Sequence, residues 1–142
     1  MIPELDASIL DRFERSLHRC TSDETFLDRF YARFLLTSDE IAVRFEGVDL
    51  KRQTSILRAS LYLVLRAASG LADGQAHLRD IARSHSKQGY DIKPVFYDHW
   101  LSSLLMAAAE TDPQFDEATR SAWEASLRPC IDVMIAEWTA ED

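Results

Sequence analysis

The sequence predicts an all-α fold, and two observations lead to this prediction. Apolar residues recur three and four positions apart through most of the chain, and no segment alternates polar and apolar residues as a half-buried strand does. All four glycines, Gly47, Gly70, Gly74 and Gly89, fall between the helices that this periodicity predicts. The length of 142 residues suits one domain with a single core. We therefore expect one helical domain over residues 1–142.

The net charge and the two cysteines narrow the range of partners and compartments. A formal charge of −8 would repel a nucleic acid or an anionic membrane surface. The N-terminus lacks the basic start and apolar run of a signal peptide, and no window holds the roughly 18 apolar residues of a membrane span. Cys20 and Cys130 form no C-x-x-C pair, which favours reduced thiols. We expect a cytoplasmic protein that binds neither nucleic acid nor a membrane.

Two helices are predicted at the start of the chain. The first covers residues 6–19, where the apolar residues share one face. Thr21 and Glu24 then have the S/T-x-x-E spacing of a capping box, which predicts that a second helix begins at Thr21. Residues 26–35 give this second helix one aromatic side.

A short helix and a long helix are predicted next. Thr37 and Glu40 repeat the capping-box spacing and predict a short helix through Ile41, followed by a corner that contains Phe45. Residues 50–68 contain neither glycine nor proline and carry a continuous apolar stripe. This segment therefore predicts a long helix.

The next helix carries His85 on its apolar side. Leu78, Ile81, Ala82 and His85 are spaced as residues that share one helical face, so the imidazole should point inward. Gly89 follows within about one turn and indicates the end of the helix. An inward histidine near a helix end is well placed to bind a buried ligand. The alternative is a core histidine whose ring is satisfied by a backbone carbonyl.

Two further helices complete the predicted fold. After Pro94, residues 97–108 make a long apolar face, and residues 111–113 end that helix. Residues 123–138 have the same periodicity and predict the last helix. Pro129 lies deep inside this segment and predicts a kink, because proline removes a backbone hydrogen bond and crowds the preceding turn.

The order of the polar and aromatic residues along the chain narrows the choice of helical fold. The residues concerned are Tyr31, Phe45, Gln53, Leu57, His85, Pro94 and Tyr97. This series resembles the globin family, and within it the bacterial single-domain haemoglobins and the globin part of flavohaemoglobins. The most specific pieces are F-Y-A-R-F with a phenylalanine 14 residues after its tyrosine, Q-x-x-x-L, and H-x-x-x-G followed by a proline. The resemblance covers nearly the whole chain, with Gln53 and His85 32 residues apart.

The resemblance implies a globin fold whose helices pack around a buried haem b, with His85 as the protein ligand of the iron. It also implies that Tyr31, Gln53 and Leu57 face a gas ligand on the distal side. The residues implied to contact the haem are Phe45, Gln53, Leu57, Ile81, His85, Ile92 and Tyr97. The sequence lacks a C-x-x-C-H site, so this haem would be held without thioether bonds.

Two departures from the family pattern leave alternatives open. The corner between Phe45 and Gln53 is about two residues shorter than the family pattern, so Ser55 could face the ligand in place of Gln53. The last helix has no carboxylate at the position that matches the proximal triad of bacterial members. Glu137 lies one residue away, beside Trp138. This second departure disfavours peroxidase-like or oxygenase chemistry.

Reversible binding of a diatomic gas is the leading functional hypothesis, with oxygen first and nitric oxide or carbon monoxide in the same pocket. It would serve oxygen binding, transport or sensing. One alternative is an enzyme, a nitric oxide dioxygenase, which would need a separate reductase. Another is a haem-free globin-fold module for sensing or interaction. The remaining histidines, His18, His77 and His99, have no second ligand at metal-like spacing, so we expect them at the surface.

Overall fold

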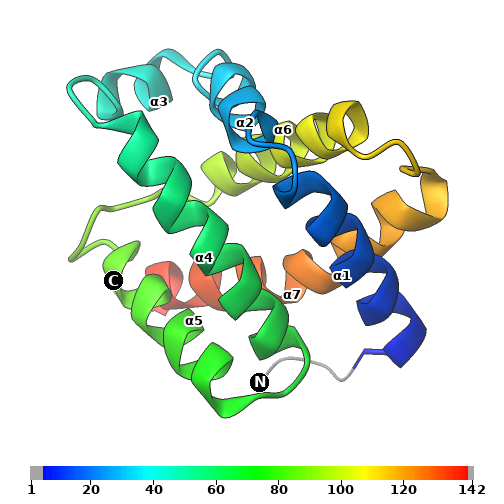
Figure 1. Cartoon of the computed structure of the whole chain (residues 1–142). Helices are drawn as coiled ribbons and strands as arrows, with labels where there is room; N and C mark the ends of the chain where they lie inside the picture. Colours follow the sequence, from blue (N-terminus) through cyan, green and yellow to red (C-terminus); the bar gives the residue numbers. More distant parts are fainter. Residues whose placement is uncertain (1–4, 141–142) are drawn as a thin grey trace.

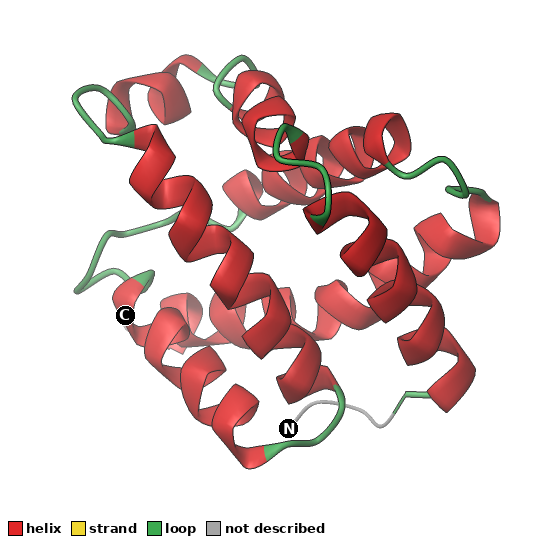
Figure 2. Ribbon diagram, in the orientation of Figure 1, coloured by secondary structure: helices red, strands yellow, loops and turns green. Residues whose placement is uncertain are grey.

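The computed structural model describes residues 5–140, which form seven α-helices and no β-strand (Figure 1, Figure 2). The helices are α1 (Ala7–Thr21), α2 (Phe26–Phe34), α3 (Asp39–Arg44), α4 (Leu50–Ala68), α5 (Ala72–Ser84), α6 (Val95–Thr111) and α7 (Glu117–Ala140). The predicted all-α class is therefore confirmed.

The helices pack in pairs, and one part of the core is aromatic. α4 lies along α5, α2 packs on α6, and both α1 and α5 contact α7. In Figure 1, α4 crosses in front of α7. Phe13 of α1 and Phe26 of α2 meet Trp123 of α7 edge to face, with ring centroids 5.0 and 6.2 Å apart. These rings are buried and join α1, α2 and α7.

The predicted limits of the two long central helices agree with the structure. α4 covers the predicted segment, and Asp49 caps it by accepting a hydrogen bond from the backbone N–H of Arg52 at 3.2 Å. α6 begins after Pro94 and ends at Thr111, as the sequence predicts. α7 continues through Pro129, so this proline lies inside the helix and does not end it.

The predicted starts of α2 and α3 are wrong. Thr21 is the last residue of α1, where its hydroxyl donates to the carbonyl of Leu17 at 2.9 Å, and α2 begins only at Phe26. Ser38, one residue after Thr37, caps α3. Serine and threonine hydroxyls can bond either to carbonyls of the turn before them or to N–H groups of the turn after them. The capping-box spacing alone therefore did not separate a helix end from a helix start.

Gly74 corrects the prediction that every glycine lies between helices, because it lies inside α5. A Cβ atom at this position would lie 2.2 Å from the backbone nitrogen of Ala67 and 2.5 Å from the carbonyl oxygen of Leu63. Only glycine permits this close approach of α5 to α4. Gly70, by contrast, occupies the turn between the two helices with φ of 82°, as a turn glycine should.

A buried polar network joins α1 to the end of α6 and to α7. Asp112 accepts hydrogen bonds from the Ser16 hydroxyl at 2.6 Å and from Nε of Arg19 at 2.6 Å. The indole N–H of Trp123 donates to the Ser16 hydroxyl at 2.9 Å. Burial acts to raise the pKa of Asp112, but the hydrogen bonds from Arg19 and Ser16 outweigh it and hold that pKa below its usual value. The carboxylate is therefore charged and fully partnered.

Both cysteines are buried and free, which agrees with the predicted reduced thiols. Burial is the main cause that raises the pKa of the Cys20 thiol to about 12 and that of the Cys130 thiol to about 11. None of the helices within residues 5–140 combines the length and the apolar character needed to span a membrane.

Candidate functional site

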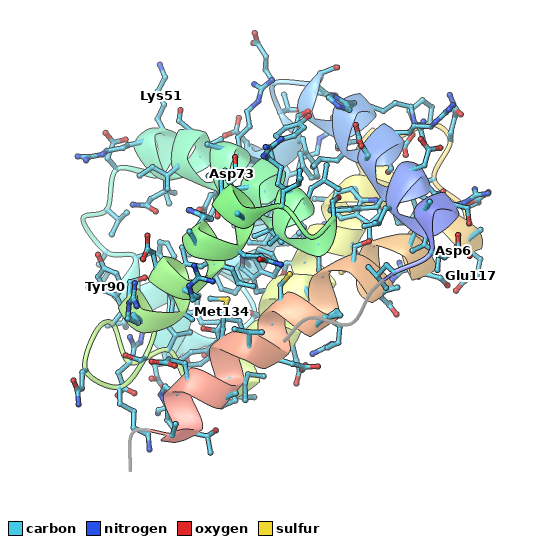
Figure 3. The ribbon with its side chains drawn as sticks, turned by 90° about the horizontal axis from the view of Figure 1, so that it is seen from below. Asp6, Lys51, Asp73, Tyr90, Glu117 and Met134 are labelled. Atoms are coloured by element: carbon cyan, nitrogen blue, oxygen red, sulfur yellow. The ribbon has the colours of Figure 1, made fainter. Side chains whose placement is uncertain are left out.

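A cavity of about 270 Å³ lies among α2, α4, α5, α6 and α7. Most of its wall is apolar, with contributions that include Leu57, Val64, Ile81, Phe96, Leu127 and Ile131. Its polar side chains include Tyr31, Gln53, Ser60, His77, His85 and Tyr97. Figure 3 shows Met134, another lining residue, where α7 passes α5. A mainly apolar cavity with a few convergent polar groups is the usual form of a small-molecule site.

His85 lies at the C-terminal end of α5 and lines the cavity. Its Nδ1 atom lies 2.8 Å from the carbonyl oxygen of Ile81. A carbonyl only accepts, so Nδ1 carries the proton and Nε2 has the lone pair. Burial lowers the pKa of His85, although the bond to Ile81 opposes this, and the ring is neutral near pH 7. A neutral imidazole held at Nδ1 by a backbone carbonyl is the form in which histidine binds a metal.

Tyr31 of α2 contributes a hydroxyl to the same cavity. The side chain is 7% exposed, and its ring lies against Phe30 and Phe45 with centroids 4.9 and 5.9 Å away. Burial raises the pKa of Tyr31 to about 12, so the phenol keeps its proton at neutral pH. The hydroxyl has no hydrogen-bond partner among the described residues. Tyr31 can therefore donate to a molecule inside the cavity.

The structure places Gln53, and not Ser55, on the wall of the cavity. Gln53 lines the cavity near the start of α4, with Leu57 one turn further along the same wall. Ser55 is exposed, and its hydroxyl donates to the carbonyl of Lys51 at 3.4 Å. Figure 3 shows Lys51 extending outward from this end of α4. The shorter corner before α4 therefore leaves Gln53 on the cavity side.

Phe45 is the one predicted haem contact that does not line the cavity. Its ring lies behind the lining residues Tyr31 and Phe34, with centroids 5.9 and 6.0 Å from theirs. The short corner places Phe45 as the C-cap of α3, so it supports the two lining rings from behind. The other predicted contacts, Ile81, Ile92 and Tyr97 among them, do line the cavity.

Tyr97 of α6 is a buried cavity residue without a carboxylate partner. Its hydroxyl is buried and has no hydrogen-bond partner within the described part of the chain. Burial also raises its pKa above the usual value for tyrosine. Near the C-terminal end of α7, the indole N–H of Trp138 donates a hydrogen bond to the carboxylate of Asp91 at 2.8 Å.

His77 corrects the prediction that the other histidines lie at the surface. It is half-buried on α5, lines the cavity, and places Nε2 2.9 Å from the Ser60 hydroxyl of α4. His99 is half-buried as well, whereas His18 is exposed. The eight-residue spacing of His77 and His85 was the available signal, because residues eight apart belong to the same broad stripe of a helix.

These residues fit a flat apolar group that carries a metal. His85 presents a neutral imidazole with a free Nε2, and the hydroxyl of Tyr31 and the unpartnered hydroxyl of Tyr97 belong to the same cavity. In the chain from 5 to 140, no three His, Cys, Asp or Glu side chains are grouped to hold a metal ion on their own. A metal bound at His85 would therefore need most of its ligands from a prosthetic group.

Comparison with known proteins gives one close structural match. The chain is similar to a protein from Pseudomonas aeruginosa PAO1 whose crystal structure is described as structurally highly homologous to a human hemoglobin. The two share 37% sequence identity and a TM-score of 0.87, over 92% of this chain and 98% of the other. No protein-family model and no curated protein matches the chain.

Proposed function

The chain belongs to the globin family, and from this premise we propose that it binds haem b without a covalent link and reversibly binds oxygen. His85 would hold the iron through Nε2. The observation that carries the proposal is a neutral, backbone-anchored His85 in the same cavity as the donor hydroxyl of Tyr31. We place this function in the cytoplasm, where the two free cysteines would stay reduced.

Each polar residue of the cavity has a separate role in this proposal. Haem iron supplies an open coordination position that takes oxygen, nitric oxide or carbon monoxide. Ile81 fixes the tautomer and the orientation of the His85 ring through its carbonyl. Tyr31 and Gln53 offer an O–H and an N–H to the gas, while Leu57 keeps water away from it. Donors held in a mainly apolar wall act more strongly than donors in water.

Spectroscopic titration of the apoprotein with haem tests the proposal. We expect saturation at one haem per chain with a Soret band, and a second spectrum that appears with oxygen after reduction and disappears when oxygen is removed. A protein that stays colourless with excess haem would contradict haem binding. A reduced protein that is oxidised by oxygen without an intermediate reversible spectrum would contradict oxygen storage or transport.

Tyr31→Phe should increase the rate of oxygen dissociation by about 10- to 100-fold, the equivalent of about 1.4–2.7 kcal/mol. The change keeps the ring, and so the contacts with Phe30 and Phe45, and removes only the donor. Carbon monoxide draws less charge from iron, so its dissociation rate should change much less. Stopped-flow measurement of both rates checks the prediction.

Gln53→Leu is the matched comparison for the same pocket. If Tyr31 is the main donor, removing the amide of Gln53 should raise the oxygen dissociation rate less than Tyr31→Phe does. The two roles would be reversed if the oxygen dissociation rate of Tyr31→Phe stayed within about twofold of wild type while that of Gln53→Leu rose. A twofold change corresponds to less free energy than one hydrogen bond contributes. No change in either variant would make the tyrosine a packing residue.

A further inference from the structure

Two polar residues of the cavity wall have no part in the proposed gas site. Ser60 of α4 and His77 of α5 both line the cavity, with the Ser60 hydroxyl 2.9 Å from Nε2 of His77. Both side chains are half-buried, so neither is fully solvated. Polar groups on a mainly apolar wall lower the free energy of a bound molecule when that molecule presents a matching polar group.

The spacing from His85 gives the place of His77 on a bound prosthetic group. His77, Ile81 and His85 follow one another at successive turns of α5, and all three line the cavity. Eight residues of helix correspond to about 12 Å along the axis. If His85 holds the centre of a flat group, His77 meets its rim. Ser60 brings α4 to the same point of the rim.

The surroundings of His77 leave its ring available to an anion. The carboxylates one turn to either side are already paired, Asp73 with Arg66 at 2.9 Å and Asp80 with Arg83. Nδ1 of His77 has no hydrogen-bond partner among residues 5–140. In the tautomer whose Nε2 accepts from the Ser60 hydroxyl, Nδ1 carries the proton and can donate it to an anion.

We propose that His77, oriented by Ser60, binds a carboxylate at the rim of the haem. This inference rests on the proposed function. The rim of haem b carries propionate groups, and a carboxylate against an apolar wall is unfavourable unless a donor meets it. An imidazole that donates to a carboxylate forms a charge-assisted hydrogen bond, which is stronger than a neutral one. The α4–α5 edge of the cavity is therefore the edge that receives one acidic substituent of the haem.

The test compares haem with haem dimethyl ester, in which both carboxylates are blocked. Wild type should lose the ester faster than the free acid when transfer to an excess of an apo-acceptor is followed by absorbance. In His77→Phe, the ratio of the two rates should fall by about 5- to 20-fold, because only the free acid loses a partner. Ser60→Ala should shift the ratio in the same direction by a smaller factor, since His77 stays but is no longer oriented.

Two controls separate binding of a carboxylate from packing. His77→Arg supplies another N–H donor and should restore most of the ratio, whereas His99→Phe, at a half-buried histidine outside the cavity, should leave it at the wild-type value. If His77→Phe and Ser60→Ala both speed the loss of haem and of its dimethyl ester by the same factor, His77 and Ser60 only pack against the haem. That result would overturn this inference and leave the proposed function intact. Failure of wild type to take up either haem would overturn the proposed function and this inference together.

Discussion

His85→Ala is expected to lower the affinity for haem by more than about 100-fold, because removing even an outer partner of a metal ligand costs up to about that factor. His85 is the one lining residue with a neutral ring, a proton fixed on Nδ1 by the Ile81 carbonyl, and a free Nε2. Added imidazole should occupy the vacated space and restore part of the binding. Haem titration followed at the Soret band measures both effects.

The matched controls for this change are the histidines outside the cavity. His18→Ala and His99→Ala should bind haem as wild type does, because neither residue lines the cavity. A His85→Ala protein that stays replete with haem and keeps the wild-type spectrum would show that another residue binds the iron. The assignment of the proximal side to α5 would then be wrong.

Asp112→Ala is expected to lower the free energy of unfolding by about 3 kcal/mol. The Asp112 side chain is 0% exposed, and its removal leaves the Ser16 hydroxyl and the Arg19 guanidinium without their acceptor. Arg19 is 26% exposed in its side chain and regains some solvent, which keeps the loss near the lower end of the range for broken buried ion pairs. Urea denaturation monitored by helical circular dichroism measures the change.

Asp11→Ala is the control for this prediction, because Asp11 pairs with Arg15 on the surface and should contribute less than about 1 kcal/mol. The folded-state pKa of Asp112 lies below its unfolded value, so its stabilisation is present above the unfolded pKa and is lost as pH falls through the folded one. Asp112→Ala should therefore lose less stability than wild type on acidification. An unfolding free energy within about 1 kcal/mol of wild type at neutral pH would contradict the network's role.

The class of the fold and the family could be predicted from the sequence because both depend on local patterns. Apolar spacing of three and four residues located α4 and α6 closely, since a helix buries one face wherever it packs. The separation of Gln53 and His85 placed a polar residue and a histidine on two consecutive long helices. No knowledge of which helices touch was needed for these predictions.

Other features depend on which distant residues meet, and the tertiary structure alone decided them. The sequence allowed either Gln53 or Ser55 to face the ligand, and only the packing of α4 placed Gln53 on the cavity wall. Gly74 was predicted to lie in a turn, but it lies inside α5, where the backbone of α4 packs directly against it. His77 was predicted at the surface, but Ser60, 17 residues earlier, holds it at the cavity.

The network of Asp112 shows the physical reason most clearly. The local sequence predicts that Asp112 ends a helix before a proline, and Asp112 is the C-cap of α6. Its acceptor role comes from Ser16, 96 residues away, and from Arg19. A helical period records only how a segment divides into an inward and an outward face. Which polar groups meet inside is set by the packing of one helix on another, and that packing exists only once the chain has folded.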